Sequence, residues 1–432
     1  MNLKRSFLLS LTAIWSMTGM AEPRSLNLEQ SLQLAMDNSE ALRIASLQIE
    51  QAADEVSEVS SSAKPQVTTS ANYSRFFDAP VLPTPMGDFP IKRNWDLTFE
   101  ARVTQVLWAF GRVSNAIEAA KIFQDLRVLN QEQAKNEVAS QVKSLYFSSL
   151  LAEKTLAIAQ ESYNNAKRNQ QSLRRRFASG RIPQYDNLKM ETDLALRLPQ
   201  VIKAEQDLAQ YTSTLKFLIG LDQETPIKIV GDWPNRVEIT ANNELLTKVL
   251  ESNLDLKALS TQKSLLEKQT QNERASRYPT IAGFAYYQKA GTGDKYYIGG
   301  DNLIDTTAVG VQINYDIWTG GSRSSRLAKS LKEERIVEEN ISQLQRNISS
   351  EIATIIANLQ SLDRNLEASR RAQTLAKEAY SLTRTRYESG LASQTELNDA
   401  EMNQTNAQLN MELILFGRQM EWIKLEKLLA GT

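Results

Sequence analysis

The stretch Trp108-Ala-Phe-Gly111-Arg112 decides the fold, because it recurs 210 residues later as Trp318-Thr-Gly-Gly321-Ser322. The same offset relates further pairs of positions: Phe177 to Tyr387, Gly180 to Gly390, Asp186 to Glu396 and Leu218 to Leu428. The correspondence runs without a gap over more than 100 residues. Self-similarity at a fixed offset indicates two copies of one structural unit.

Each copy reads as a helix, two strands, a long helix and a return helix. The first helix is predicted over Leu28–Ser62 and, in the second copy, over Asn243–Ser276. Pro65 and Pro279 end these two helices. A loop rich in Pro or Gly then separates the two strands of each copy.

The second strand of each copy alternates apolar and polar residues. In Trp95–Trp108 one face is apolar and the other carries residues such as Glu100 and Arg102, and Thr307–Trp318 repeats the alternation. Runs of about ten alternating residues with aromatic ends fit membrane-spanning β-strands. A half-buried strand of a soluble antiparallel sheet shows the same alternation. The N-terminal secretion signal described below and the neighbouring helices favour the interpretation as membrane-spanning strands.

The long helices are predicted over about Arg112–Arg176 and Ser322–Arg386, because neither range contains proline or an interior glycine. At ~1.5 Å per residue, such a helix spans roughly 100 Å, which exceeds an ordinary globular core. Gly390, like Gly180 before it, suits the left-handed residue that ends a helix. Glu396 falls in the first turn of the return helix, where the helix dipole favours a carboxylate.

The N-terminus has the three parts of a secretory signal peptide. Lys4 and Arg5 are basic, Phe7–Met17 is mostly apolar, and Gly19-Met20-Ala21 has small residues at a cleavage site. The mature chain is expected to begin at Glu22, where no Cys offers a lipoprotein anchor. The predicted divisions are a signal peptide at 1–21, a first structural repeat at 22–220, a linker or equatorial segment at 221–241 and a second repeat at 242–432.

The composition excludes several classes of function. The chain has 50 Lys and Arg against 51 Asp and Glu, so it lacks the basic excess of a nucleic-acid binder. It has no Cys and no His. Disulfides, thiol nucleophiles, Cys/His zinc sites and His-based acid–base catalysis are therefore excluded. We expect no enzyme, no metal site, no cofactor and no nucleic-acid partner.

The predicted strands require more than one copy of the chain. Eight strands give a barrel interior that side chains just fill, so four strands cannot enclose a lumen. The sequence therefore predicts an oligomer without setting the number of copies.

Two duplicated features carry a family resemblance. They are the junctions Trp108–Arg112 and Trp318–Gly321 and the motifs Phe177-x-x-Gly180-(x)5-Asp186 and Tyr387-x-x-Gly390-(x)5-Glu396. Through these features the sequence resembles the TolC family over nearly all of the mature chain. This resemblance implies an α+β membrane protein. It implies a homotrimer with a 12-stranded outer-membrane β-barrel, four strands per chain, continued by a long periplasmic α-helical coiled-coil barrel. It also implies contact with outer-membrane lipid, a periplasmic adaptor (membrane fusion) protein and an inner-membrane pump.

The resemblance implies a gate at the periplasmic tip. Tyr387, Glu396 and Asp399 match the aromatic and two acidic positions of the family's constriction. A ring of carboxylates in a narrow pore favours cations. Ala392 stands where the family's arginine is expected and Lys189 replaces an acid, which puts the family's gate ion pairs in question. The alternative is that Glu396 and Asp399 act only locally, at the start of a helix.

The two turns that follow the long helices are the expected docking positions for the adaptor. The residues concerned are Gly180, Arg181, Ile182, Gly390 and Leu391. Exposed apolar and small residues at a helical hairpin tip can accept a partner hairpin by packing. The alternative is that these turns only end the helices.

The implied function is the exit duct of a tripartite export system that passes small toxic compounds or secreted proteins. Type I protein secretion is the alternative to drug efflux. A soluble periplasmic adaptor would explain the helices but neither the alternating strands nor the repeat. A diffusion porin needs many strands per chain, which the predicted helical content contradicts.

Overall fold

The computed structural model describes residues 24–78, 80–91, 93–178, 183–235, 243–296 and 303–430. The predicted signal peptide lies outside them. The chain divides into two compact units. Unit 1 comprises Met1–Ser39, Val138–Glu238 and Leu359–Ile423, and unit 2 comprises Glu40–Glu137, Ile239–Asn358 and Lys424–Thr432. Each unit combines segments of both sequence halves, and the predicted division into repeats stays a prediction.

The long helices and the return helices have equivalent bounds in the two halves. Helix α3 covers Arg112–Ala178 and α7 covers Ser322–Glu388, with 67 residues each. Helix α4 covers Gln184–Leu218 and α8 covers Gln394–Leu428, with 35 residues each. All these limits differ by the 210 residues of the sequence repeat. The prediction of two long and two return helices is confirmed.

The first helix of each half is interrupted, so the prediction of one continuous helix was wrong. The first half has α1 (Leu28–Asn38) and α2 (Glu40–Ser61), and the second has α5 (Asn243–Ser252) and α6 (Leu254–Ala275). The breaks fall at Ser39 and Asn253, whose ψ angles of 122° and 123° are extended rather than helical. Asn253 caps α6 by accepting a hydrogen bond from the backbone N–H of Leu256 at 3.0 Å.

An asparagine at or next to each break donates a hydrogen bond to a carbonyl at the end of a return helix. In unit 1, Asn38 Nδ2 donates to the carbonyl of Ile219 at 3.1 Å. In unit 2, Asn253 Nδ2 donates to the carbonyl of Leu428 at 3.3 Å. The last carbonyls of a helix have no partner within it. The interruption in the first helix therefore places an amide where the end of the return helix needs a donor.

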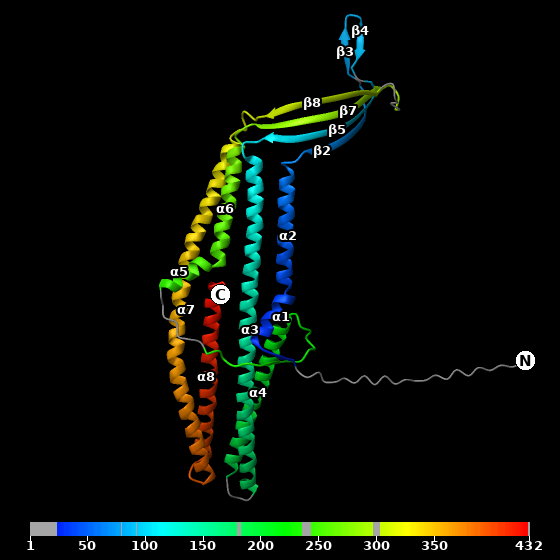
Figure 1. The fold of residues 1–432 in the computed structure, drawn as a ribbon. Helices are drawn as coiled ribbons and strands as arrows, with labels where there is room; N and C mark the ends of the chain where they lie inside the picture. Colours follow the sequence, from blue (N-terminus) through cyan, green and yellow to red (C-terminus); the bar gives the residue numbers. More distant parts are fainter. Residues whose placement is uncertain are drawn as a thin grey trace, which may run out of the picture. The chain divides into compact units, whose positions relative to one another are not determined.

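Unit 2 contains an antiparallel sheet with the strand order β2-β5-β7-β8 (Figure 1). The strands are β2 (Gln66–Arg75), β5 (Trp95–Trp108), β7 (Thr280–Gly293) and β8 (Leu303–Asn314). Helices α2, α3, α6 and α7 adjoin one end of this sheet (Figure 1). Strand β5 has the predicted bounds, and β2 and β8 form the two edges.

Strand β8 ends at Asn314, four residues before the predicted end at Trp318. The first turn of α7 supplies the reason. Arg323 Nη2 lies 3.2 Å from Asp316 Oδ2, and its guanidinium lies 5.6 Å from the ring centroid of Tyr315. These residues therefore pack against the start of the helix instead of extending the strand.

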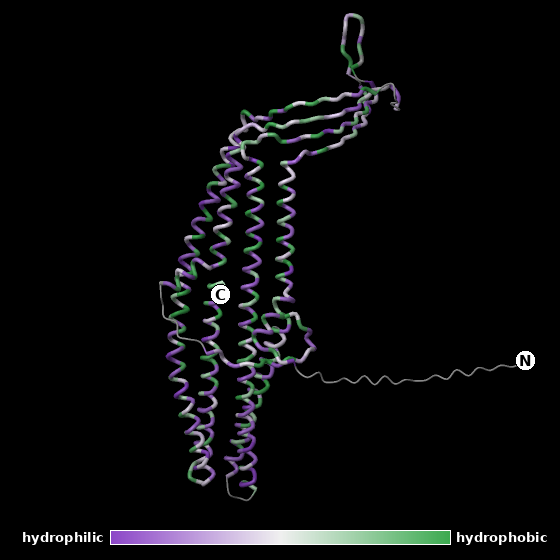
Figure 2. The backbone as a smooth tube through the Cα atoms, in the orientation of Figure 1, coloured by the Kyte–Doolittle hydropathy of each residue, from purple (hydrophilic) through white to green (hydrophobic). Residues whose placement is uncertain are grey.

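The strand register gathers apolar side chains on one face of the sheet. Val67 pairs with Val103, Val103 with Ala285, and Ala285 with Val309. Successive residues point to opposite faces, so Glu100, Arg102 and their cross-strand neighbours lie on the other, more polar face. Figure 2 shows hydrophobic and hydrophilic residues alternating along these strands. The predicted alternation is confirmed.

Two small pairs of strands were not predicted. The proline-rich segment predicted as a loop contains the hairpin of β3 (Val81–Thr84) and β4 (Gly87–Pro90). In unit 1, β1 (Arg24–Leu26) pairs in parallel with β6 (Ile227–Ile229), which lies in the predicted linker. Strands of three or four residues carry too little periodicity to be recognised.

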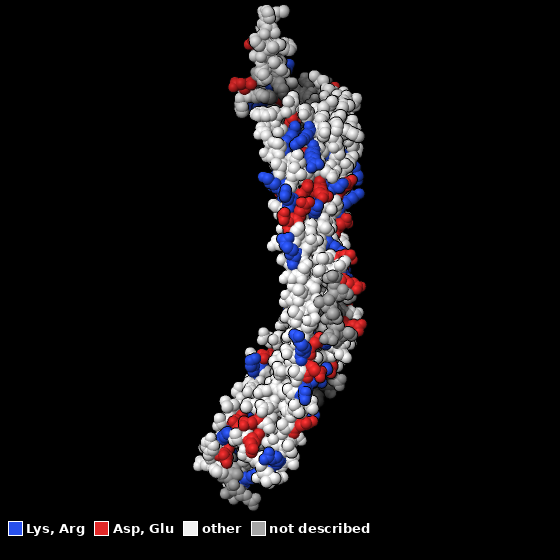
Figure 3. All heavy atoms as spheres, turned by 90° about the vertical axis from the view of Figure 1, so that its left-hand side faces the viewer, with Lys and Arg blue, Asp and Glu red and all other residues white. Residues whose placement is uncertain are grey.

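Each unit has its own apolar core. In unit 1 the core includes Phe147, Leu150, Leu215 and Ile219, each no more than 1 % exposed. In unit 2, Val249 of α5 packs with Ile348 and Ile352 of α7. Across the described ranges, every helix is too short or too polar to cross a membrane. On the face shown in Figure 3, basic side chains are interspersed with acidic ones.

Candidate functional site

The turn after α7 ends the helix through Gly390, whose φ of 77° is left-handed. The Gly390 N–H donates to the carbonyl of Tyr387 at 3.0 Å, and the Leu391 N–H donates to that of Arg386 at 2.7 Å. This pair of bonds is the Schellman motif, in which glycine avoids the steric cost of the left-handed conformation. Leu391 is 71 % exposed at this turn. Docking of an adaptor there stays a prediction, and Gly180, Arg181 and Ile182 lie outside the described residues.

Glu396 forms a capping box at the start of α8. Its Oε2 accepts from the Ser393 N–H at 2.6 Å, and its own N–H donates to Ser393 Oγ at 3.2 Å. Hydrogen bonds from the Ser393 backbone and side chain lower the pKa of Glu396. The local role that the sequence allowed for Glu396 is therefore present. Asp399, one turn further along α8, is exposed.

Tyr387 contacts a cation that the sequence did not reveal. The guanidinium of Arg176, in the last turn of α3, lies 5.3 Å from the Tyr387 ring centroid, within cation–π range. Burial raises the pKa of the Tyr387 hydroxyl, and Asp186 adds to this while Arg176 opposes it. The family resemblance implies an arginine at position 392, where this sequence has alanine (Ala392). The ends of α3 and α7 are linked instead through Arg176.

Polar contacts join α4 to α8 at successive turns, and we call them the α4–α8 contact series. They are Lys189 Nζ to Thr395 Oγ1 at 3.1 Å, Gln394 Nε2 to Met190 Sδ at 3.4 Å, Asn398 Nδ2 to Asp193 Oδ2 at 2.6 Å and Arg197 Nη1 to Glu401 Oε1 at 2.8 Å. Lys189, which replaces an acid of the family pattern, takes part. The two return helices are therefore held together by side chains of both signs and by neutral amides.

The Arg197–Glu401 pair is the most buried contact of this series. The side chains are 14 % and 2 % exposed, respectively. Arg197 Nη1 also donates to the carbonyl of Ser162 at 3.1 Å and to its Oγ at 2.7 Å, so the guanidinium binds α3 as well. Burial raises the pKa of Glu401, and the positive charge of Arg197 opposes this shift.

Sequence reasoning missed this pair, although α4 carries a signal for it. Met190, Leu194, Val201 and Ala204 recur at helical spacing, and three of them are buried. Arg197 occupies the position that continues this apolar row. A charged residue within an apolar row predicts a buried partner, but only the folded structure identifies Glu401 of α8 as that partner.

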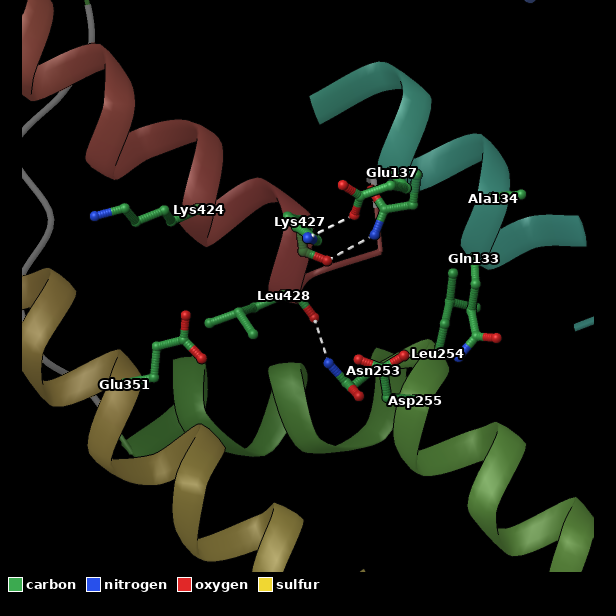
Figure 4. Close-up of a pocket in the computed structure, with 11 residues that line it drawn as sticks. Gln133, Ala134, Glu137, Asn253, Leu254, Asp255, Glu351, Lys424, Lys427 and Leu428 are labelled. Carbon is green, nitrogen blue, oxygen red and sulfur yellow. Dashed lines mark hydrogen bonds and ion pairs between the residues drawn. The ribbon is translucent and has the colours of Figure 1, made fainter. Parts of the chain in front are cut away.

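A pocket of about 570 Å³ lies at the end of α8 in unit 2 (Figure 4). Asn136 Nδ2 donates to the carbonyl of Lys427 at 2.7 Å, and Lys427 Nζ lies 2.6 Å from Glu137 Oε2. Further lining residues are Gln133, Asp255, Glu351 and Lys424. These lining contacts hold the end of α8, which is a structural role. The described residues contain no cluster of acidic side chains that could hold a metal ion.

Known proteins resemble the chain over nearly its whole length. A family model described as "Outer membrane efflux protein" matches residues 31–221 and 245–431. The chain is 22 % identical over 406 residues to "Probable outer membrane lipoprotein SilC" of Salmonella typhimurium, covering 92 % of this chain and 84 % of SilC.

Solved structures share the fold. The CmeC outer membrane channel of Campylobacter jejuni matches with a TM-score of 0.81 and 17 % identity, over 94 % of this chain and 85 % of CmeC. The outer membrane protein VceC of Vibrio cholerae matches with a TM-score of 0.78 and 15 % identity, over 94 % and 96 %. The matched family consists of outer-membrane channels and not of enzymes. The match of the family model and of the solved channels confirms the resemblance to the TolC family. The chain belongs to the outer membrane efflux protein family and is located in the outer membrane.

Proposed function

We propose that the chain is one of three identical subunits of an outer-membrane exit duct in a tripartite export system. The observation that carries this proposal is the sheet of unit 2. Its face with Val103 and Val309 is mainly apolar, as a lipid-facing surface must be, and the charged residues Arg75, Lys289 and Asp305 of this face lie towards its Trp95 end. Its edge strands β2 and β8 each have one neighbour within the chain. Unpaired strand edges are not tolerated in lipid, so a barrel must close with further copies.

Three copies would supply twelve strands, more than the eight whose interior is filled by side chains. The polar face with Glu100 and Arg102 would then line the lumen. Long helices continuing from the sheet suit a periplasmic extension that meets an adaptor and an inner-membrane pump. CmeC is named as an outer membrane channel, which supports a channel role for this chain, and SilC is named as a probable outer membrane lipoprotein, which supports the same location.

The proposed cargo belongs to one of two classes, small toxic compounds or secreted proteins. In such a system, specificity lies largely in the pump and adaptor. Export of a toxic dye and of a type I secreted protein, each measured in cells that depend on this chain, separates the two cargo classes.

The gate of this duct is assigned to Tyr387, Glu396 and Asp399. Support comes from the left-handed turn at Gly390, which brings the end of α7 next to the start of α8. The cation–π contact between Arg176 and Tyr387 and the α4–α8 contact series would hold the helix ends in the closed state. These contacts would take the place of the ion pairs that Ala392 cannot form.

Electron microscopy of the detergent-purified mature protein tests the assembly. A particle with three-fold symmetry is expected, together with single-channel currents in planar phosphatidylcholine bilayers. A monomeric particle without channel activity would contradict the proposal and favour a soluble adaptor.

A further inference from the structure

Arg75 is the last residue of β2 and lies on the apolar face of the sheet. The register pairs Arg75 with Trp95 and Tyr73 with Leu97. Because side chains alternate between faces, these four residues share the face that carries Phe99 and Val103. The Trp95 end of β5 is opposite the Trp108 end, which leads into α3. If the sheet spans the membrane as proposed, Arg75 lies at the extracellular rim of the lipid-facing surface.

Two aromatic rings contact Arg75, and a third ring stacks on one of them. The rings of Tyr73 and Trp95 stack with centroids 5.3 Å apart and an interplanar angle of 17°. The guanidinium carbon of Arg75 lies 4.8 Å from the Phe77 centroid and 5.3 Å from the Trp95 centroid. Both distances fall within cation–π range. The cation is therefore held at a defined place among side chains that prefer the boundary between apolar and polar lipid regions.

Arg75 has no carboxylate partner among the residues that the structure describes. The neighbouring basic side chains of the sheet region differ in this respect. Arg93 Nη1 lies 3.3 Å from Asp294 Oδ2, and Lys289 Nζ lies 3.4 Å from Asp305 Oδ1.

Arg102 offers a direct comparison within the same sheet. It lies over the rings of Phe284 and Tyr286 at 5.5 and 4.9 Å, but on the polar face. Its Nε donates to Glu100 Oε1 at 2.7 Å. An arginine between rings thus has its counter-charge supplied by the protein on the polar face. On the lipid-facing side, Lys289 has Asp305 as its counter-charge, whereas the described residues supply none to Arg75, whose side chain is exposed.

We propose that Arg75, with Tyr73, Phe77 and Trp95, binds the phosphate group of an anionic lipid in the outer leaflet. The planar guanidinium presents paired N–H donors that match phosphate oxygens. The rings would contact the apolar part of the same lipid. The proposal rests on the proposed function, because it requires the apolar face of the sheet to meet lipid.

Native mass spectrometry of the detergent-purified assembly tests the site, with bisphosphorylated lipid A as the probe. Wild type is expected to retain lipid A, and chemically dephosphorylated lipid A is expected to bind more weakly. Loss of a charge-assisted hydrogen bond corresponds to about a tenfold or greater loss of affinity, which is the effect expected for R75Q. R75K keeps the charge but not the planar fork and should bind with intermediate affinity.

The matched controls are R93Q, which removes a cation already paired with Asp294, and R102Q, which changes the polar face. Both should retain lipid A as wild type does. Wild-type affinity in R75Q would overturn the proposal. Displacement of lipid A by inorganic phosphate at equal concentration would also overturn it, because the site would then recognise the free anion.

Channel currents in phosphatidylcholine bilayers, which contain no lipid A, separate this proposal from the proposed function. R75Q should conduct as wild type does. If the wild-type protein forms no channel, the proposed function fails. If it conducts but R75Q retains lipid A, only the lipid site fails.

Discussion

Arg197 Nη1 of α4 lies 2.8 Å from Glu401 Oε1 of α8, and this ion pair is not repeated in the other half of the chain. At the 210-residue offset, Arg197 corresponds to Ala407 and Glu401 corresponds to Glu191. Duplication therefore determines the bounds of the two return helices but not their mutual contacts. The α4–α8 contact series therefore makes the two helical hairpins chemically different.

Removing the cation of this pair should destabilise the protein strongly. R197Q leaves the buried Glu401 carboxylate without its partner, and breaking a buried pair in this way costs about 3–5 kcal/mol. E401Q should cost less, because burial already favours a neutral side chain at 401. Thermal unfolding followed by circular dichroism measures both. K203Q, which removes an exposed pair with Asp207 on the same helix, is the control. Equal midpoints for R197Q and K203Q would contradict the prediction.

The raised pKa of Glu401 predicts a pH dependence of stability. A carboxyl group whose pKa is higher in the folded protein binds its proton more tightly there than in the unfolded chain. Its contribution to stability is fully present below the ordinary value of 4.5 and is lost as the pH rises through the folded pKa. The unfolding midpoint of wild type relative to E401Q should therefore rise as the pH falls from neutral towards 4.5. A difference that does not vary with pH would show that Glu401 does not titrate in this way.

Two glycines of unit 1 should respond to alanine with opposite signs. Gly390 has a φ of 77°, and the left-handed conformation costs an L-residue roughly 1–2 kcal/mol, so G390A should lower the unfolding midpoint. Gly417 lies inside α8, and a Cβ there would meet Leu362 Cδ2 at 3.5 Å, an ordinary contact. Because alanine is favoured over glycine in a helix by about 0.5–1 kcal/mol, G417A should raise the midpoint. Changes of the same sign would refute this account of the turn.

Neutralising Glu396 and Asp399 together should raise the conductance or weaken the cation preference of the channel. Glutamine at 396 can keep the capping bond to the Ser393 backbone, so the E396Q/D399N variant removes charge while preserving the helix start. Planar-bilayer recordings measure conductance and reversal potential. E388Q, which neutralises an exposed acid of α7 paired with Arg384, is the control. Unchanged conductance and selectivity in the double variant would remove these two residues from the gate.

Much of the fold could be predicted because its elements are long and duplicated. A range of 65 residues without proline or interior glycine has few alternatives to a helix, and the repeat supplied each limit twice. Strand β5 was predicted with its bounds because its alternation runs over 14 residues. The interruptions at Ser39 and Asn253 were missed, since polar residues are common within helices. The folded structure marks the breaks by extended ψ angles and, at Asn253, by a capping hydrogen bond.

The candidate site was predicted less completely. Tyr387, Glu396 and Asp399 came from resemblance to a family, and their gate role is still a proposal. Arg176, Asp193 and Arg197 were not singled out, because a contact between helices far apart in sequence has no local pattern. The capping bonds of Glu396 depend on Ser393, a neighbour at the spacing of a known motif, and could have been recognised.

By itself, the sequence determined the repeat, the long helices, the alternating strands and the absence of Cys- and His-based chemistry, because each follows from local pattern or composition. Only the tertiary structure decided which helix faces meet and which charges find partners. Glu401 is buried against Arg197, whereas Arg75 remains exposed between two aromatic rings. The physical reason is that burial and ion pairing depend on side chains brought together from distant segments, and periodicity along one segment does not specify them.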